Sequence, residues 1–200
     1  VNKRIPVVAG SGANSTSEAL QLTQRSKELG ADACLLVTPY YNKPTQKGLY
    51  AHYKKIADEV SIPQILYNVP GRTSVDMLPD TVYDLSSHPN IVGIKEASGD
   101  LERSKEILEK CSDNLSIFTG DDKTSARDIG LGFSGNISVT ANIVPLDMHN
   151  MCKLASEGNS DDAQKINTKI DTLHDNLFLE SNPIPVKWAL NKMGLIKKGI

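Results

Sequence analysis

Six short apolar runs, each followed by a polar turn and an amphipathic stretch, constrain the fold of this chain more than any other feature. The runs are rich in Val, Ile and Leu and lie at 5–9, 33–37, 64–67, 91–94, 115–118 and 136–139. Apolar runs without strict alternation are typical of parallel strands covered on both faces. Strands that alternate with helices along the chain predict an α/β fold built from βα units.

The segments between the runs carry helix signals. Ser15 and Glu18 have the spacing of a capping box, and Gly30 can end that helix in a left-handed conformation. In the next segment apolar residues recur with the period of a helix, which predicts one buried stripe. The stripe consists of Leu49, Tyr53, Ile56, Ala57 and Val60.

After the sixth run the pattern becomes helical only, with helices expected at 145–157, 160–179 and beyond residue 185. Six βα units are fewer than the eight of a TIM (β/α)8 barrel, which typically has about 250 residues. We therefore expect an incomplete barrel at 1–144, followed at 145–200 by the last barrel helix and a helical C-terminal region. An open doubly wound sheet is the alternative, but no G-x-G-x-x-G motif follows the first run.

Composition excludes several classes of function. The formal net charge is -2, and no run of basic residues could follow a nucleic-acid backbone. No apolar stretch approaches the roughly 18–20 residues that span a membrane, and the first residues lack the apolar middle of a signal peptide, so we expect a cytoplasmic protein. The three cysteines and four histidines are scattered. We therefore expect neither a disulfide framework nor a metal site.

Lys95 is the most unusual residue for its position, because it directly follows the apolar run at 91–94. A lysine at the carboxyl end of a barrel strand faces the region where such barrels place their active sites. When its ammonium is desolvated, it loses its proton more readily, and the neutral amine can attack a ketone to form a Schiff base. The alternative is a structural ion pair with Glu96 or another carboxylate.

Other candidate residues follow neighbouring runs. Tyr67 ends the run one βα unit before Lys95, so its phenol could lie beside the amine and transfer protons. Arg72 follows in the next loop and could bind a substrate carboxylate through two parallel hydrogen bonds. Tyr40 and Tyr41 follow the run at 33–37 and could line the mouth of a barrel or reach a neighbouring subunit. A buried core tyrosine and a surface salt bridge are the alternatives for Tyr67 and Arg72.

Four separated motifs and a fifth segment resemble the dihydrodipicolinate synthase family, and the likeness covers nearly the whole chain. They are Thr-Pro-Tyr-Tyr-Asn at 38–42, Tyr-Asn-Val-Pro-Gly-Arg-Thr at 67–73, Gly-Ile-Lys-Glu-Ala-Ser-Gly at 93–99, Ser-Gly-Asn-Ile-Ser-Val-Thr-Ala-Asn at 134–142 and Asn-Pro-Ile-Pro-Val-Lys at 182–187. The resemblance implies a lyase that needs no cofactor and condenses pyruvate with aspartate semialdehyde in the diaminopimelate route of lysine biosynthesis. It also implies a homotetramer, a dimer of dimers.

The resemblance assigns roles to single residues. Lys95 matches the Schiff-base lysine and Tyr67 the proton donor and acceptor. Arg72 matches the arginine that receives the carboxylate of aspartate semialdehyde. Tyr41 matches a tyrosine lent across a dimer interface, and Ile137 a residue that contacts pyruvate. The family's Gly-Thr-Thr-Gly-Glu motif belongs on the second strand and is not present, so we expect the six units to be the third to the eighth, and a chain that lacks the motif to be inactive.

Two alternatives to this function stay open. One is another Schiff-base aldolase, such as N-acetylneuraminate lyase or a 2-keto-3-deoxy sugar-acid aldolase. The other is a non-catalytic barrel that binds an acid. The resemblance also implies a feedback site for lysine at Asn14, Glu18 and Tyr40, because a carboxylate suits an ammonium ligand. The capping box at Glu18 explains that residue equally well without a ligand.

Overall fold

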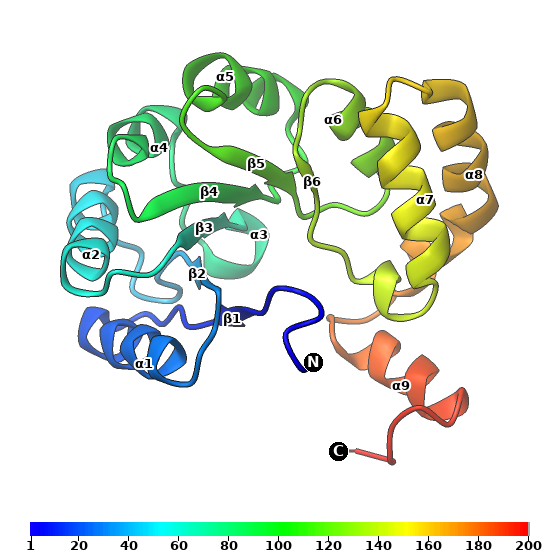
Figure 1. Cartoon of the computed structure of the whole chain (residues 1–200), viewed down its shortest axis with the longest axis horizontal. Coiled ribbons are helices and arrows are strands. Elements are labelled where there is room, and N and C mark those ends of the chain that lie inside the picture. The colour runs from blue at the N-terminus through cyan, green and yellow to red at the C-terminus, as the bar shows by residue number, and fades with distance from the viewer. Residues whose placement is uncertain (200) are drawn as a thin grey trace. The chain divides into compact units, whose positions relative to one another are not determined.

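The computed structural model describes residues 1–199, and these form two compact units, Val1–Phe118 and the part that starts at Thr119. The first unit contains strands and helices in alternation, whereas the second is mainly helical (Figure 1). The predicted boundary between 144 and 145 remains a prediction. The α/β class with strands that follow one another in chain order is confirmed.

The first unit is built on parallel strands that pair in the order of the sequence. The strands are β1 (Val8–Gly10), β2 (Ala33–Val37), β3 (Gln64–Asn68), β4 (Ile91–Glu96) and β5 (Ser116–Thr119), of which β5 ends at the first residue of the second unit. Because parallel strands run in one direction, their carboxyl ends lie along one edge of the sheet. This edge carries Tyr67 and Lys95 near the ends of β3 and β4, and Tyr40 and Tyr41 in the loop after β2.

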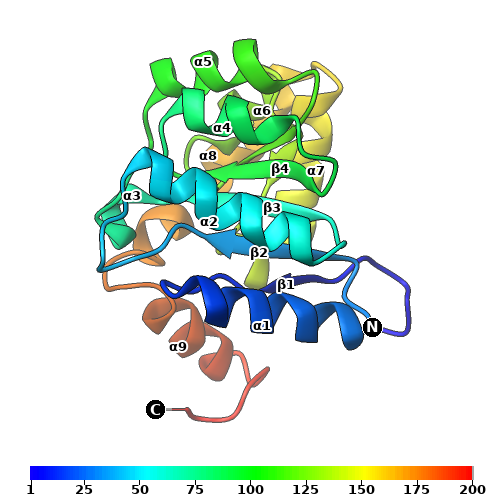
Figure 2. The ribbon, with the colours of Figure 1, turned by 90° about the vertical axis from the view of Figure 1, so that its left-hand side faces the viewer.

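Helices cover one face of these strands, as Figure 2 shows for α1, α2, α4 and α5. They are α1 (Thr16–Glu28), α2 (Gln46–Glu59), α4 (Pro79–Ser86) and α5 (Leu101–Cys111), and the short α3 (Pro70–Thr73) directly follows β3. The five residues of the predicted stripe on α2 and its C-cap are at most 1% exposed, which confirms the periodicity. The Tyr53 hydroxyl donates to the carbonyl of Leu36 at 3.1 Å, so this buried phenol is satisfied.

The first strand differs from its prediction, because β1 begins at Val8 rather than at Ile5. The side chain of Ile5 is 58% exposed, so its apolar character does not reflect burial in the core. The amide of Val7 donates to the carboxylate of Asp32 at 2.7 Å. The backbone amide of the residue before β1 is thus hydrogen-bonded to a side chain and not to a neighbouring strand.

A bulge interrupts the pairing of β3 with β4. Gln64 is opposite Ile91, but Ile65 is opposite Gly93, so Val92 is an additional residue on β4. Gly93 lies against β5, where a Cβ atom would be 2.6 Å from the carbonyl oxygen of Ser116. Only glycine permits this close approach of two backbones.

The second unit contains one short strand, β6 (Gly135–Asn136), next to Thr119, to whose carbonyl the amide of Ile137 donates at 3.0 Å. Its helices are α6 (Ser125–Gly130), the 3-10 turn η1 (Thr140–Asn142), α7 (Pro145–Ser156), α8 (Ser160–Asn176) and α9 (Ile184–Lys192). The three predicted C-terminal helices are confirmed.

The strand β6 is shorter than the predicted 136–139 because a side chain takes over the backbone hydrogen bonds. The buried carboxylate of Asp122 accepts the amides of Val139 and Thr140 at 3.0 and 2.8 Å and the side-chain amide of Asn136 at 2.8 Å. These amides are then not available to continue a strand ladder. Among residues 1–199, no helix is both long enough and apolar enough to cross a membrane.

Candidate active site

Lys95 and Tyr67 lie side by side on neighbouring strands, as their spacing by one βα unit predicts. They are register partners on β4 and β3, and the Lys95 ammonium nitrogen is 4.3 Å from the centre of the Tyr67 ring. Lys95 is 9% exposed and Tyr67 is half-buried. The pair therefore combines an amine largely withdrawn from water with a phenol within reach of a group bound to it.

The acidity of the Tyr67 phenol is set by two opposing influences. Burial raises the pKa of Tyr67 above its usual value, because the phenolate is poorly solvated there. The positive charge of Arg72 acts in the opposite direction and lowers it. Arg72 belongs to α3, the turn of helix that follows β3, and its side chain is exposed. The structure thus brings Arg72 into the electrostatic surroundings of Tyr67, on a residue that is exposed at the surface of the first unit.

Tyr41 is at the same edge of the first unit but points into solvent. Its amide donates to the carbonyl of Thr73 at 3.4 Å, and its side chain is 89% exposed. Its backbone has a φ of +74°, a conformation that is uncommon for residues other than glycine and asparagine. A large aromatic side chain held in this conformation and left exposed fits a surface that a partner covers.

The residues of the predicted lysine site are only partly connected. The side-chain amide of Asn42 donates to the carbonyl of Asn14 at 3.0 Å, and the backbone amide of Asn42 donates to the carbonyl of Tyr40 at 2.9 Å. Asn42 thus joins the loops that carry Asn14 and Tyr40. Glu18 is exposed, and its amide donates to the Ser15 hydroxyl at 3.5 Å, as expected for one half of a capping box. Helix capping therefore uses the backbone of Glu18 and leaves its carboxylate in solvent.

Ile137, the predicted pyruvate contact, lies in the second unit. It directly follows β6 and is half-buried. The hydrogen bond from its amide to Thr119 fixes its backbone beside the end of β5. Its predicted contact with a substrate remains a prediction.

A cluster of polar side chains beside the candidate site was not expected from the sequence. Glu96 is 3% exposed, and its carboxylate accepts hydrogen bonds from Asn68 at 3.1 Å, from the Ser98 amide at 2.8 Å and from Arg103 at 3.4 Å. Arg103 also binds Asp76 at 2.8 Å. The sequence alone predicts for Glu96 only a possible ion pair with Lys95. The alternation of side chains along β4 is the signal that separates the two residues, because it directs the adjacent Lys95 and Glu96 to opposite faces of the sheet.

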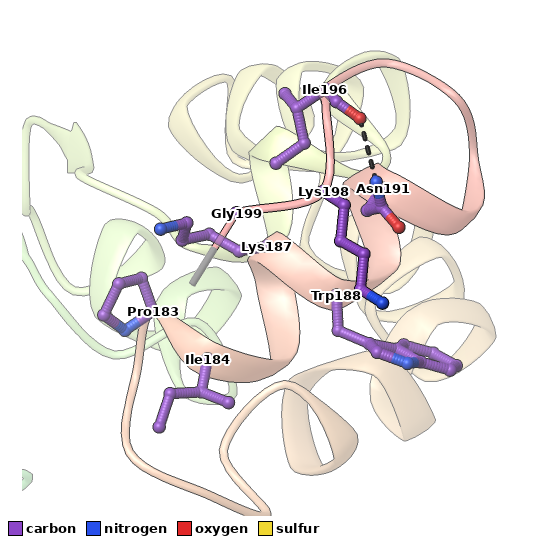
Figure 3. Close-up of a pocket in the computed structure, with 8 residues that line it drawn as sticks. All are labelled: Pro183, Ile184, Lys187, Trp188, Asn191, Ile196, Lys198 and Gly199. Carbon is purple, nitrogen blue, oxygen red and sulfur yellow. Dashed lines mark hydrogen bonds between the residues drawn. The ribbon is translucent and has the colours of Figure 1, made fainter.

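No metal centre is formed by the residues that the structure describes, since no three His, Cys, Asp or Glu side chains come together there. A hollow of about 310 Å³ lies beside α9 in the second unit (Figure 3). It is lined by Pro183, Ile184, Lys187, Trp188, Asn191, Ile196, Lys198 and Gly199. None of these lining residues is a predicted site residue, so the hollow is not part of the candidate active site.

Known proteins match this chain over its full length. Residues 1–200 match the dihydrodipicolinate synthetase family. The 4-hydroxy-tetrahydrodipicolinate synthases of Stutzerimonas stutzeri and Pseudomonas aeruginosa are each 60% identical over 200 residues, which is 100% of this chain and 68% of each relative. These identities are far above the level at which only the fold is shared.

Solved structures give the same result. The dihydrodipicolinate synthase of Acinetobacter baumannii, solved in complex with pyruvate, is 57% identical with a TM-score of 0.98 and is matched over 100% of this chain and 68% of its own. The enzyme of Aquifex aeolicus is 43% identical with a TM-score of 0.97, over 100% and 68%. The chain described here belongs to the dihydrodipicolinate synthase family.

Proposed function

We propose that Lys95 is the residue that forms a Schiff base with pyruvate, and that Tyr67 transfers the protons of this reaction. The observation that carries the proposal is the distance of 4.3 Å between the Lys95 nitrogen and the centre of the Tyr67 ring. The two residues are register partners on parallel strands, so their side chains lie on the same face of the sheet. An amine that attacks a ketone needs a neighbouring group that can donate and accept a proton within hydrogen-bonding reach.

The overall reaction follows from the family and from relatives that are 60% identical. It is the condensation of pyruvate with aspartate semialdehyde to 4-hydroxy-tetrahydrodipicolinate, a lyase reaction of the diaminopimelate route of lysine biosynthesis. The relatives named above are synthases, which favours this reaction over those of the sugar-acid aldolases and over a non-catalytic barrel.

In the proposed mechanism, the neutral amine of Lys95 attacks the carbonyl carbon of pyruvate, and water leaves to give an imine. The protonated imine withdraws electrons, so the methyl group can lose a proton and become an enamine. The enamine carbon adds to the aldehyde of the second substrate. Tyr67 carries protons at these steps, and the substrate's own amine finally displaces Lys95 as the ring closes.

Arg72 is proposed to select the second substrate. Arg72 is an exposed residue, and its charge lowers the pKa of Tyr67, so a carboxylate bound to it would bring an aldehyde near the same phenol. A planar guanidinium binds a carboxylate through two parallel hydrogen bonds. Ile137 is proposed to contact pyruvate.

The proposed assembly is a homotetramer, in which Tyr41 reaches the active site of a neighbouring subunit. The exposure and the unusual backbone conformation of Tyr41 support this role.

Three further parts of the proposal concern the whole protein. We propose that the strands are the third to eighth of a (β/α)8 barrel and that the protein is cytoplasmic. We also propose that Asn14, Glu18 and Tyr40 bind lysine as a feedback inhibitor. A dihydrodipicolinate synthase from Cyanidioschyzon merolae that matches this fold was solved with lysine bound. A monomeric dihydrodipicolinate synthase variant also matches this fold.

The decisive experiment is reduction with borohydride in the presence of pyruvate, carried out on the full-length protein that contains this sequence. We expect one reduced pyruvate adduct, mapped by mass spectrometry to the peptide that contains Lys95. The Lys95→Arg variant should form none, because its guanidinium stays protonated. Lys105→Arg, at an exposed position of α5, is the matched control and should form the adduct as the parent does. An adduct that persists in Lys95→Arg contradicts the proposal.

A further inference from the structure

We propose that Asn68, Asp76, Glu96 and Arg103 form a positioning cluster, which holds the ends of β3 and β4 so that Lys95 stays beside Tyr67. The inference rests on the proposed role of Lys95. Arg103 is its central positioning residue, because its guanidinium contacts both carboxylates of the cluster.

The cluster is placed one residue beyond the reacting pair on each strand. Tyr67 is opposite Lys95, and Asn68 is opposite Glu96. Successive side chains of a strand point to opposite faces, so Asn68 and Glu96 are directed away from the face that carries the amine and the phenol. The cluster therefore acts on the reaction through the backbone of the two strand ends and not through contact with substrate.

Asn68 ties β3 to two other segments. Its side-chain amide donates to Glu96 on β4 at 3.1 Å and to Asp76 at 3.0 Å, and its side-chain oxygen accepts the amide of Met77 at 3.0 Å. Both polar ends of this buried side chain are occupied. Movement of β3 along β4 would break these bonds in a place where water cannot replace them.

Arg103 links the same strand end to the first turn of α5. Its Nε donates to Glu96 at 3.4 Å, one terminal nitrogen donates to Asp76 at 2.8 Å, and the other donates to the carbonyl of Met77. Glu96 in turn accepts the amide of Ser98, which fixes the turn between β4 and α5. The fork of donors on a guanidinium can bind three groups in fixed directions, whereas a lysine at this position offers one charged centre.

Such a cluster matters for catalysis because small displacements are costly. A displacement of a reacting group by about 1 Å can slow a reaction roughly a hundredfold. A purely structural ion pair predicts a different result, namely a lower stability with an unchanged rate per folded molecule. The two roles can be separated by measuring the rate and the stability of the same variants.

The test compares Arg103→Lys with the parent in the full-length protein. We measure the rate of pyruvate adduct formation at saturating pyruvate, the KM for pyruvate and the thermal midpoint. A decrease in rate on the order of 10-fold to 100-fold is expected, with a KM close to that of the parent. The matched control is Arg127→Lys in the second unit, where Arg127 pairs with the buried Asp128 at 2.9 Å. It should lower the thermal midpoint and keep the parental rate.

The outcomes are distinct. A parental rate in folded Arg103→Lys, or an equal loss of rate in Arg127→Lys, overturns the inference. If the parent itself forms no adduct at Lys95, the proposed function fails instead. Should Arg103→Lys not fold, Asp76→Asn decides, because Asp76 is 40% exposed at its side chain and its loss removes a single partner of Arg103. A slower rate in that variant supports the cluster, and an unchanged rate overturns it.

Discussion

Each unit of the molecule buries one histidine, and the two histidines differ in their surroundings. His52 in the first unit is 5% exposed, and its Nδ1 is 2.9 Å from the Thr16 hydroxyl. His174 in the second unit is 3% exposed, and its Nδ1 is likewise 2.9 Å from the hydroxyl of Thr140. Its Nε2 also lies 3.2 Å from the side-chain oxygen of Asn167, whereas the Nε2 of His52 has no hydrogen-bond partner among the described residues.

The difference shows that partners and charges, and not burial alone, set the state of a buried side chain. Burial lowers the pKa of His52 to about 4. Burial also lowers the pKa of His174, but the negative charges of Asp122 and other acidic residues oppose the shift. Exclusion of water thus keeps the imidazole of His52 neutral. The imidazole of His174 is instead fixed in place by hydrogen bonds to its neighbours.

The largest expected effect comes from breaking the network of the second unit at Asp122. Asp122→Ala removes the acceptor of the buried amide of Thr140 and of the amide of Val139. Each unsatisfied amide costs about 1–3 kcal/mol, so with two amides we expect the free energy of unfolding to fall by about 2–6 kcal/mol. Urea unfolding followed by the fluorescence of Trp188, the single tryptophan, measures it. Glu180→Ala, at an exposed position of the second unit, is the control and should cost less than about 0.5 kcal/mol; equal losses would contradict the role of Asp122.

The second effect is a dependence of stability on pH in the first unit. The pKa of His52 is about 4 in the folded state and 6.5 when unperturbed. Because the folded pKa is the lower one, its contribution is complete above pH 6.5 and is lost as the pH falls toward 4. The loss is about 3 kcal/mol. Urea unfolding of the parent and of His52→Gln over this range should give curves that diverge by this amount. Parallel curves would mean that His52 titrates normally.

A smaller effect should follow when His174 is made to resemble His52. Asn167→Ala removes the hydrogen-bond partner of Nε2 and leaves that nitrogen buried, at a cost of roughly 1–2 kcal/mol. Thermal unfolding at pH 7 measures it, and Gln164→Ala on the exposed side of α8 is the control. If both variants unfold at the parental temperature, Asn167 does not stabilise His174.

The smallest effect is expected at surface ion pairs, in which the two units should not differ. Lys54 pairs with Asp58 in the first unit and Lys165 with Asp162 in the second, both at 2.7 Å. Solvent screens such pairs and their side chains lose freedom on pairing. Lys54→Ala and Lys165→Ala should therefore leave the thermal midpoint unchanged within error. A clear decrease in only one variant would show that its pair is part of a larger network.

The sequence predicts the repeating architecture and the adjacency of Lys95 and Tyr67 because both depend on local periodicity. Apolar runs at fixed intervals specify consecutive parallel strands, and consecutive strands bring the residues at their carboxyl ends together. The stripe on α2 is predicted for the same reason.

Features that depend on individual side-chain partners were not predictable. Ile5 is apolar yet exposed, and β6 ends early because Asp122 binds the amides that a longer strand would use. The cluster around Glu96 joins residues that are up to 35 positions apart in the sequence. What sets these polar residues apart from other polar residues is the face of the sheet on which they lie, and not their residue type. Such pairings follow from tertiary packing, which local patterns do not contain.

The bulge at Val92 determines which residue faces Tyr67. If Val92 instead paired with Ile65, continuous pairing from Gln64 opposite Ile91 would place Ile94, not Lys95, opposite the phenol. The side chains of residues 93–96 would then each point to the opposite face of the sheet. The Lys95 ammonium would then be turned toward the helices, and the Glu96 carboxylate toward the face that carries the phenol of Tyr67. Deletion of Val92 with unbroken pairing from Ile91 would keep Lys95 opposite Tyr67, so it is the looped-out position of this one aliphatic residue that keeps the amine and the phenol on the same face.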